Sequence, residues 1–335
     1  MRSLRAGDPS LVIIGCSGSR FYLNKSLADR DYALPFSTAR YGAALRHIIE
    51  AERIDLVIPT SDFDVRRIGA VRKRLGCRTF LPSNALIRRC QDKYELTRFL
   101  RRRRISAPRT YAISDSDSVE KIFSRFESGA KLWCRIRSGS GSYGAVPVRT
   151  AQQVRGWMHF WESMRSVPSH SFTLSEYLPG RDYCVQCLWK SGRLILAKMA
   201  ERITYLESGS PSGVSSMPAL AKTALDSGVI DVCARAIRAL DPRANGVFFV
   251  DLKENESGEP CITEINAGRF ATMTNIHDLV GKHNMAVTYV RLALGEQSEL
   301  DESVDYVDGY YLVRSVDTLP AIVHEDDLFR GIHNA

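Results

Sequence analysis

The chain has 335 residues, of which 44% are hydrophobic and 25% are charged, and its formal net charge is +8. A single core rarely grows past roughly 250–300 residues, so this length predicts two or three domains. No apolar run approaches the ~20 residues that span a bilayer. We expect a soluble, cytoplasmic protein without a membrane partner, because the short apolar run 11–15 is typical of a buried strand.

The positive charge and the cysteines do not indicate a specialised class of protein. The densest basic run, Arg101 to Arg104, ends a predicted helix, where the helix dipole favours cations. No aromatic residues are interleaved with this run, so nucleic acid is not an expected partner. The eight cysteines are scattered, which predicts reduced core residues rather than disulfides. Cys184 and Cys187 should face opposite sides of a strand, which argues against a redox or metal pair.

Residues 1–88 alternate between short strands and helices, which predicts a small domain with a parallel sheet. The turn after the first strand lacks the full G-x-G-x-x-G spacing, so a tight βα turn is favoured over a dinucleotide site. The expected elements are strands at 11–15, 54–59 and 78–81 and helices at 38–50 and 62–75.

From residue 89 the pattern changes to helices mixed with antiparallel strands. Helices are expected from 91, over 115–127, from 151, over 220–240 and over 284–294. Strands are expected at 109–113, 131–136, 145–149, 172–178, 182–189, 193–203, 246–252 and 260–266, with a final pair at 309–314 and 321–323. The fold class is therefore α/β and α+β, with a small parallel α/β domain preceding antiparallel sheets.

Two strands near the C-terminal third carry the strongest functional signal. Glu264 and Asn266 alternate along one strand and so point to the same face. Asp251 in the preceding strand can lie beside them if the turn N-E-S-G pairs the two strands. Oxygen ligands of this kind suit magnesium or manganese, whereas the alternative is a solvated strand end.

A loop rich in glycine and serine, R-S-G-S-G-S-Y-G, lies between two predicted strands at 137–144. Glycines leave backbone N–H groups free to approach an anion, and serines add donors. No G-K-[ST] follows, so the loop is not a Walker loop; the alternative is a connecting loop without function. The candidate phosphate-binding residues are Gly139, Ser140, Gly141 and Ser142.

Four cations flank these two signals and could bind phosphate. Lys93 begins a helix, and Arg135 ends the strand that leads into the glycine loop. Arg202 and Arg269 lie in the C-terminal half. Taken singly, each of them is better explained as a surface charge, and their value lies in flanking the other two signals.

An extended segment, S-E-Y-L-P-G-R-D, could present backbone groups to the edge of an adenine. The candidates in it are Glu176, Tyr177 and Leu178, and Asp182 could accept hydrogen bonds from ribose hydroxyls. The alternative is a strand that ends in a Pro-Gly turn.

Taken in order, these motifs resemble the ATP-grasp superfamily, and most closely its carbamoyl-phosphate synthetase large-subunit-like branch, over roughly residues 11–295. In that family a small α/β domain precedes two lobes that hold ATP between antiparallel sheets. The resemblance implies an N-terminal domain at 1–88, an ATP-grasp domain at 89–298 with lobes of about 108–175 and 176–298, and a strand-containing tail at 299–335.

The resemblance also implies roles for the candidate residues. Q-D-K-Y resembles the start of a family helix, so Lys93 would contact ATP phosphates, and W-C-R-I-R-S-G-S-G-S-Y-G places Arg135 as a phosphate-binding cation beside the glycine loop. E-I-N is the most specific match. The implied adenine hinge is Glu176, Tyr177 and Leu178, with Asp182 at the ribose and Asp251, Glu264 and Asn266 at the metal.

The sequence departs from the family pattern at two places. Ile136 stands where a proline usually follows the phosphate-binding cation. The family's E-[IM]-N-P-R becomes E-I-N-A-G-R, which puts Arg269 one residue later than expected. Arg202 lies in a segment that resembles the variable acceptor side, so Arg202 and Arg269 are the candidate catalytic residues.

The implied reaction uses ATP with Mg²⁺ or Mn²⁺ to activate a carboxylate as an acyl phosphate, which an amine then attacks to form an amide. The implied partners are small carboxylates and amines, with amino acids among the candidates, and the assembly could be a homodimer. The alternatives are an ATP-grasp enzyme with another nucleophile and an ATP-binding regulatory protein without catalysis. We expect His277 and His283 on a helix surface rather than in an acceptor pocket.

Overall fold

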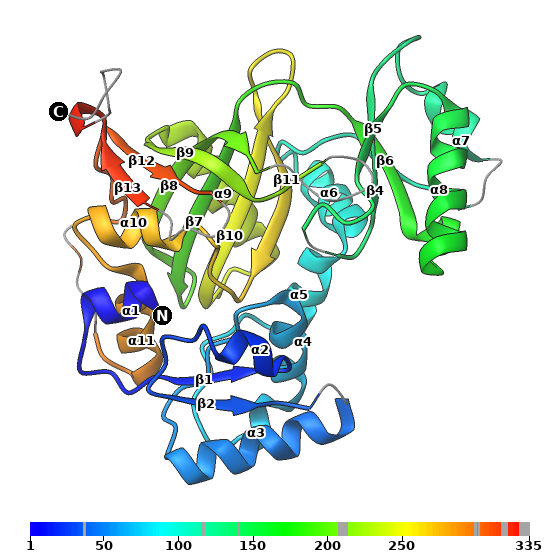
Figure 1. The fold of residues 1–335 in the computed structure, drawn as a ribbon. Helices are drawn as coiled ribbons and strands as arrows, with labels where there is room; N and C mark the ends of the chain where they lie inside the picture. The colour runs from blue at the N-terminus through cyan, green and yellow to red at the C-terminus, as the bar shows by residue number, and fades with distance from the viewer. Residues whose placement is uncertain are drawn as a thin grey trace, which may run out of the picture.

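The computed structural model describes residues 1–35, 38–114, 118–139, 141–206, 214–297, 300, 302–315 and 321–327. Within these residues the strands form a two-stranded, a four-stranded and a seven-stranded sheet. The small two-stranded sheet lies below the large sheet, and the four-stranded sheet lies to one side of it (Figure 1). The fold class predicted from the sequence is confirmed.

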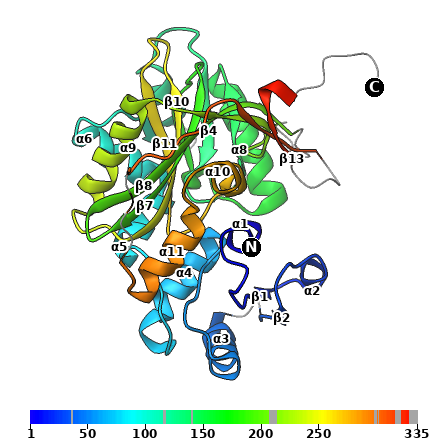
Figure 2. The same ribbon diagram turned by 90° about the vertical axis from the view of Figure 1, so that its left-hand side faces the viewer.

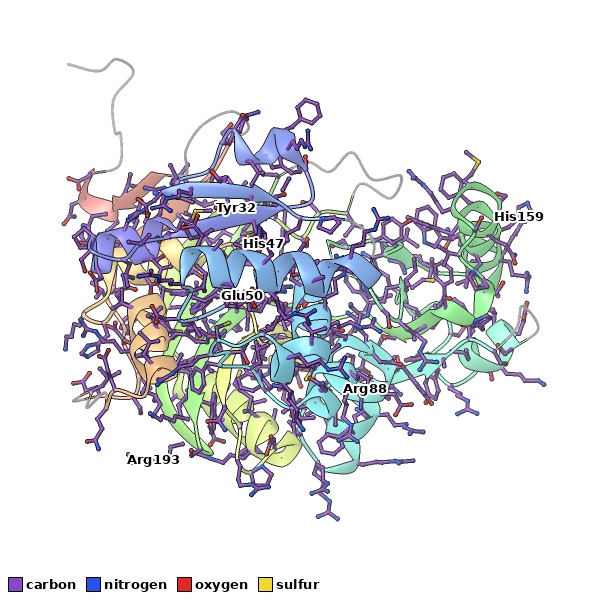
Figure 3. The ribbon with its side chains drawn as sticks, turned by 90° about the horizontal axis from the view of Figure 1, so that it is seen from below. Tyr32, His47, Glu50, Arg88, His159 and Arg193 are labelled. Carbon is purple, nitrogen blue, oxygen red and sulfur yellow. The ribbon has the colours of Figure 1, made fainter. Side chains whose placement is uncertain are left out.

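The N-terminal part contains one short parallel strand pair, Ile14 with Arg30 through Ser17 with Ala33. Helix α3 runs across its lower side, as the view from below shows with His47 and Glu50 marked (Figure 3). Apolar side chains of α3 and α4, including Leu45 and Ile68, form the core of this part. Its elements are α1 Arg2–Gly7, β1 Ile14–Ser17, α2 Arg20–Leu23, β2 Arg30–Ala33, α3 Thr38–Glu52, α4 Asp62–Val71, η1 Arg72–Arg74 and α5 Asn84–Gln91.

The prediction of strands at 54–59 and 78–81 is wrong. These two segments share a single isolated bridge, between Leu56 and Arg78. Their apolar side chains pack instead against helices: Ile58 and Phe80 against α11 (Met285–Leu294), and Leu81 in the core formed with α3 and α4. Burial against a helix therefore explains their hydrophobicity without a strand ladder, while the polar strand β2 gave no hydrophobic signal.

The four-stranded sheet is antiparallel and has helices on one face. Its order is β3-β6-β4-β5, and its core joins Leu132 and Phe172 of the sheet to Val154 and Trp161 of α8. Helix α6 (Lys93–Arg102) leads into this part of the chain. The remaining elements are β3 Thr110–Ala112, α7 Ser118–Phe123, β4 Leu132–Ile136, β5 Val146–Val148, α8 Ala151–Arg165, η2 Ser169–Ser171 and β6 Phe172–Glu176.

The seven-stranded sheet is antiparallel and covered on both faces (Figure 2). Helices α5, α6 and α9 (Ser227–Leu240) pack on the face that contains Cys187, whereas α10 (Thr274–Val280) and α11 pack on the other. Cys184 lies on that second face, so the two cysteines do point in opposite directions. The order of the strands in this sheet is β11-β10-β7-β8-β9-β12-β13. Along the chain they are β7 Asp182–Lys190, β8 Arg193–Tyr205, β9 Pro218–Ala224, β10 Gly246–Glu254, β11 Pro260–Ala267, β12 Tyr310–Val313 and β13 Ala321–His324.

The helix predicted at 220–240 begins too early. Residues 220–224 belong to β9, which pairs with β8 on one side and with β12 on the other. Asp226 then caps α9 by accepting hydrogen bonds from the backbone N–H groups of Gly228 and Val229. The β12–β13 pair extends the large sheet through β9, and η3 (Glu325–Asp327) follows it. None of the described helices has the length and apolar character needed to cross a membrane.

Candidate active site

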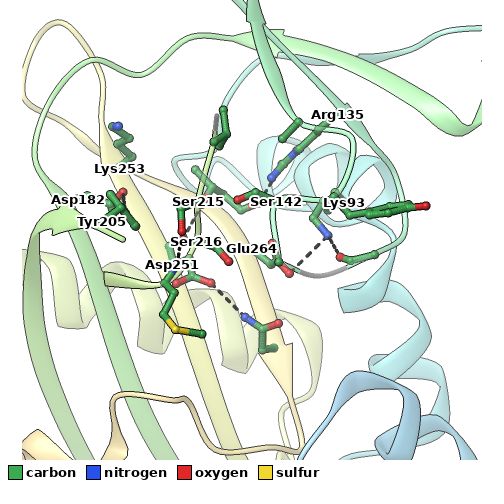
Figure 4. A pocket seen from close by; sticks show the side chains of 18 of the residues that line it. Lys93, Arg135, Ser142, Asp182, Tyr205, Ser215, Ser216, Asp251, Lys253 and Glu264 are labelled. Atoms are coloured by element: carbon green, nitrogen blue, oxygen red, sulfur yellow. Dashed lines mark hydrogen bonds and ion pairs between the residues drawn. The ribbon is translucent and has the colours of Figure 1, made fainter. Parts of the chain in front are cut away.

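A cavity of about 820 Å³ lies between the two antiparallel sheets and reaches the N-terminal part of the chain at Asp62. Lys253, Asp182 and Tyr205 lie on one side of it and Lys93 and Arg135 on the other, with Asp251 and Glu264 between them (Figure 4). Ser140 lies outside the described residues. The other predicted site residues all line this cavity: Lys93, Arg135, Gly139, Gly141, Ser142, Glu176, Tyr177, Leu178, Asp182, Arg202, Asp251, Glu264, Asn266 and Arg269.

The two acidic residues and the asparagine are brought together by strands β10 and β11. Asp251 pairs directly with Glu264, and Phe249 pairs with Asn266, in the antiparallel register that the N-E-S-G turn sets. The Asn266 Nδ2 donates a 3.0 Å hydrogen bond to Asp251 Oδ2. No cluster of three or more His, Cys, Asp or Glu side chains suited to a metal occurs in the described parts of the chain. Two carboxylates and one amide oxygen still form a donor set of the kind that Mg²⁺ uses together with phosphate oxygens.

Two cations lie close to this acidic group, Lys93 at the start of α6 and Arg135 in β4. Lys93 Nζ donates a 2.5 Å hydrogen bond to the Gly139 carbonyl and lies 3.4 Å from Glu264 Oε1. Arg135 Nη2 donates to the Thr263 carbonyl at 3.0 Å. Burial lowers the pKa of Arg135, although the carboxylates of Glu264 and Asp251 oppose this shift. Its buried Nε has no partner among the described residues, and an anion in the cavity could satisfy such a donor.

The glycine loop is anchored at its start to helix α6. Asp92 caps α6 and also accepts a 2.6 Å hydrogen bond from Arg137 Nη2, while the Lys93 N–H donates to the Arg137 carbonyl. At the other end Gly144 has a φ of +68°, and a Cβ there would lie 2.4 Å from Ile136 Cδ1. An isoleucine at position 136, where the family usually has a proline, therefore fits this loop, because its side chain occupies the space that Gly144 leaves free.

Arg202 lies between two of the predicted binding acids. Its Nη1 donates to Asp182 Oδ1 at 3.2 Å, and its Nη2 donates to Asp251 Oδ1. The hydroxyl of Tyr205 donates a 2.5 Å hydrogen bond to the other Asp182 oxygen. Burial would lower the pKa of Arg202, but the neighbouring carboxylates, led by Asp251, raise it well above its usual value. Arg202 is therefore a permanent cation that links the predicted ribose side to the predicted metal side.

The predicted hinge segment follows β6 at the edge of the cavity. The Arg109 Nε donates to Glu176 Oε2 at 2.9 Å, and Leu178 is buried. The ammonium of Lys131 lies 3.9 Å from the centroid of the Tyr177 ring. These contacts hold the segment that connects the two sheets.

Several cavity residues were missed from the sequence, and Asp62 is the most consequential. Arg269 Nε and Nη2 donate to the two oxygens of Asp62 at 2.8 and 2.9 Å. Asp62 begins helix α4, where an acid is ordinarily explained by the helix dipole, so nothing local distinguished it. The other missed lining residues include Tyr205, Ser215, Ser216 and Lys253.

The prediction that His277 lies on the surface of a helix is wrong. Only 3% of this residue is exposed, because α10 presses it against the large sheet near Lys198 rather than towards solvent. His283 is partly buried and lies just before α11. Neither histidine is among the residues that line the cavity.

A family model described as an ATP-grasp domain matches residues 90–273, which is more than half of the chain. The chain belongs to the ATP-grasp family. This ATP-grasp protein has no match among curated proteins. The superfamily predicted from the motifs is thus confirmed, whereas its carbamoyl-phosphate synthetase-like branch stays a prediction.

Solved structures similar to this ATP-grasp protein share its fold at low sequence identity. A biotin carboxylase from Campylobacter jejuni has a TM-score of 0.71 and 12% identity, over 92% of this chain and 70% of that chain. An L-amino acid ligase from Bacillus licheniformis has a TM-score of 0.68 and 14% identity, over 92% and 74%. The biotin carboxylase domain of a 2-oxoglutarate carboxylase from Hydrogenobacter thermophilus, solved with MgADP, has a TM-score of 0.72 and 13% identity, over 92% and 70%.

Proposed function

We propose that this ATP-grasp protein is an ATP-dependent ligase that activates a carboxylate as an acyl phosphate and joins it to an amine. One observation carries the proposal: Asp251, Glu264 and Asn266 meet on adjacent strands and face a cavity that also contains Lys93 and Arg135. Acids next to cations in one cavity suit a polyphosphate bound with a metal ion. The match to the ATP-grasp family and the ligases among its structural neighbours support the same chemistry.

The ATP subsite uses the elements on both sides of the cavity. Lys93 and Arg135 hold the phosphates, and the loop with Gly139, Gly141 and Ser142 covers them with backbone N–H groups. The extended segment Glu176 to Leu178 lies along the adenine, and Asp182 accepts hydrogen bonds from the ribose. Because phosphoryl transfer depends mainly on positioning and electrostatics, this site needs no protein nucleophile.

The donor set of Asp251, Glu264 and Asn266 fits Mg²⁺, or Mn²⁺, rather than a softer metal, because all its ligand atoms are oxygens. An ion held there would supply charge neutralisation for the phosphates during transfer. Arg202, which donates to Asp251, would limit the net negative charge that the two carboxylates create.

The substrate carboxylate attacks the γ-phosphoryl group, and ADP leaves. The amine then attacks the acyl carbon and loses a proton, and inorganic phosphate leaves with one oxygen of the original carboxylate. Arg269 stabilises the transferred phosphoryl group, and closure of the glycine loop excludes water from the reactive intermediate. We place the protein in the carbamoyl-phosphate synthetase-like branch, with small carboxylates and amines, including amino acids, as substrates.

A screen for ADP release tests the proposal. Wild-type protein with MgATP is incubated with pairs of amino acids and other small carboxylates and amines, and products are detected by mass. We expect at least one pair to give ADP and a condensed product, with Glu264→Gln inactive on that pair. MgATP binding without ADP release for any acceptor would favour the non-catalytic regulatory alternative. A condensed product with a thiol or hydroxyl instead would assign the other nucleophile.

A further inference from the structure

We infer that Asp62 of the N-terminal domain is a positioning residue, which fixes the guanidinium of Arg269 for recognition of the transferred phosphoryl group. The inference rests on the proposed function, and it assigns a task in the site to a part of the chain outside the ATP-grasp match at 90–273. Both residues line the cavity.

The geometry of the pair is that of a fork on a carboxylate. Nε and Nη2 of Arg269 meet the two Asp62 oxygens at 2.8 and 2.9 Å, and the two side chains are 16% and 23% exposed. Nη2 also donates to Asn266 Oδ1 at 2.6 Å. Such a bidentate contact fixes the plane of the guanidinium as well as its position.

One edge of the guanidinium is left for a ligand. Among the described residues, Nη1 has a single long contact, 3.5 Å to the Phe270 carbonyl. The other cavity cations that form ion pairs use acids of the ATP-grasp sheets: Arg202 pairs with Asp182 and Asp251, and Lys93 pairs with Glu264. Arg269 alone among these three takes its acid from the N-terminal domain.

The shifted position of Arg269 in E-I-N-A-G-R follows from the packing of this domain. Gly268 has a φ of +94°, a conformation that favours glycine. A Cβ at Gly268 would lie 3.2 Å from both Leu81 Cδ2 and Val65 Cγ1, so the turn passes close against the N-terminal domain. The extra residue relative to the family pattern thus turns the chain towards α4 and brings Arg269 to Asp62.

Asp62 is itself held in place. It is the first residue of α4, and the Ser61 hydroxyl caps this helix by accepting from the Asp64 N–H. The Asp62 carbonyl accepts a 2.9 Å hydrogen bond from Gln91 Nε2 at the end of α5. A carboxylate fixed on a rigid helix end is a suitable support for a side chain that must meet developing charge without rearranging.

The test compares the binding of MgADP with and without aluminium fluoride, which mimics the transferred phosphoryl group, by calorimetry. We expect aluminium fluoride to increase the affinity of the wild type for MgADP. In Asp62→Asn this increase in affinity should be about 10-fold smaller, because hydrogen bonds between charged groups are the strong ones. MgADP alone should bind both proteins equally. Asp64→Asn, on the same helix but not among the residues that line the cavity, is the matched control and should behave like the wild type.

A double-mutant cycle separates positioning from a general structural effect. In an Arg269→Lys background, which keeps the charge but removes the fork, Asp62→Asn should cause no further loss. If Asp62→Asn does not give a cooperative melt, Asp62→Glu replaces it. In that variant the increase in affinity should be about threefold smaller than in the wild type, because the longer side chain displaces the bidentate contact with Arg269.

Different results would contradict the proposed function and the role of Asp62. Wild-type protein that does not bind MgAMP-PNP would contradict the proposed function. Wild-type protein that binds MgAMP-PNP but gains nothing from aluminium fluoride, or an Asp62→Asn variant that keeps the full gain, would overturn the inference about Asp62.

Discussion

Replacing Lys198 with methionine should destabilise the protein severely. The Lys198 side chain is 1% exposed, and its Nζ lies 2.9 Å from Asp305 Oδ2 and 3.7 Å from Asp278 Oδ1. The ammonium also donates to the carbonyls of His277 and His283, at 2.8 Å for His277. It therefore joins strand β8 to α10, to the start of α11 and to the segment before β12.

The magnitude follows from what the substitution leaves behind. Methionine fills similar space but leaves two carboxylates and two carbonyls in a buried site without their cation. Breaking a buried ion pair on one side costs about 3–5 kcal/mol, which is a large part of the stability of an ordinary domain. We expect the free energy of unfolding, measured by urea titration at pH 7, to fall by about this amount.

The matched control is Lys222→Met on the neighbouring strand. Lys222 is 41% exposed and pairs with Glu201 at 3.2 Å, so its loss should cost less than about 1 kcal/mol. Adding Asp305→Asn to Lys198→Met should restore part of the stability, because it removes one of the unpaired charges. A Lys198→Met variant no less stable than Lys222→Met would refute the reasoning.

Three other substitutions test other parts of the account. Burial, followed by the charge of Lys198, lowers the pKa of His277 from 6.5 to about 3, so the unfolded chain takes up a proton that the folded protein refuses. His277 has no effect on the free energy of unfolding above pH 6.5, and it lowers that free energy by about 1.4 kcal/mol per pH unit as the pH falls from 6.5 towards 3. Urea titrations at pH 7 and pH 5 should therefore show a loss of stability that is about 2 kcal/mol smaller in His277→Leu than in the wild type. Gly144→Ala should slow turnover and weaken the binding of MgAMP-PNP, measured by calorimetry, because the φ of +68° and the contact with Ile136 exclude a Cβ at this position. An unchanged affinity would count against a role of the glycine loop in covering the phosphates. Glu264→Gln should weaken Mn²⁺ binding about 10-fold by electron paramagnetic resonance with AMP-PNP present, while the thermal melt stays within a few degrees; equal Mn²⁺ affinity would remove Glu264 from the metal site.

Alternation along single strands made much of the site predictable. Glu264 and Asn266 could be placed on one face by periodicity, and the N-E-S-G turn brought Asp251 beside them. The glycine loop and Lys93 were recognisable because turn residues and helix starts have local signals. The antiparallel sheets followed from the same patterns, whereas in the parallel pair only β1 overlaps a predicted strand.

The contacts that depend on tertiary packing were not predictable. Nothing local distinguishes Asp62 from an ordinary acid at a helix start, and nothing in the apolar strand β8 marks Lys198 as the centre of a buried cluster. The segment at 54–59 has the composition of a strand but shares only one isolated bridge with 78–81 and packs against helices. In each of these cases the partner lies far away in the sequence.

The most direct test of the central claim follows an oxygen atom. Once an acceptor pair is known, its carboxylate is labelled with ¹⁸O, and the inorganic phosphate released with MgATP is analysed by mass. The account predicts one ¹⁸O atom in each phosphate, because a carboxylate oxygen becomes the bridge of the acyl phosphate and leaves with phosphorus. Amide product accompanied by unlabelled phosphate would contradict it.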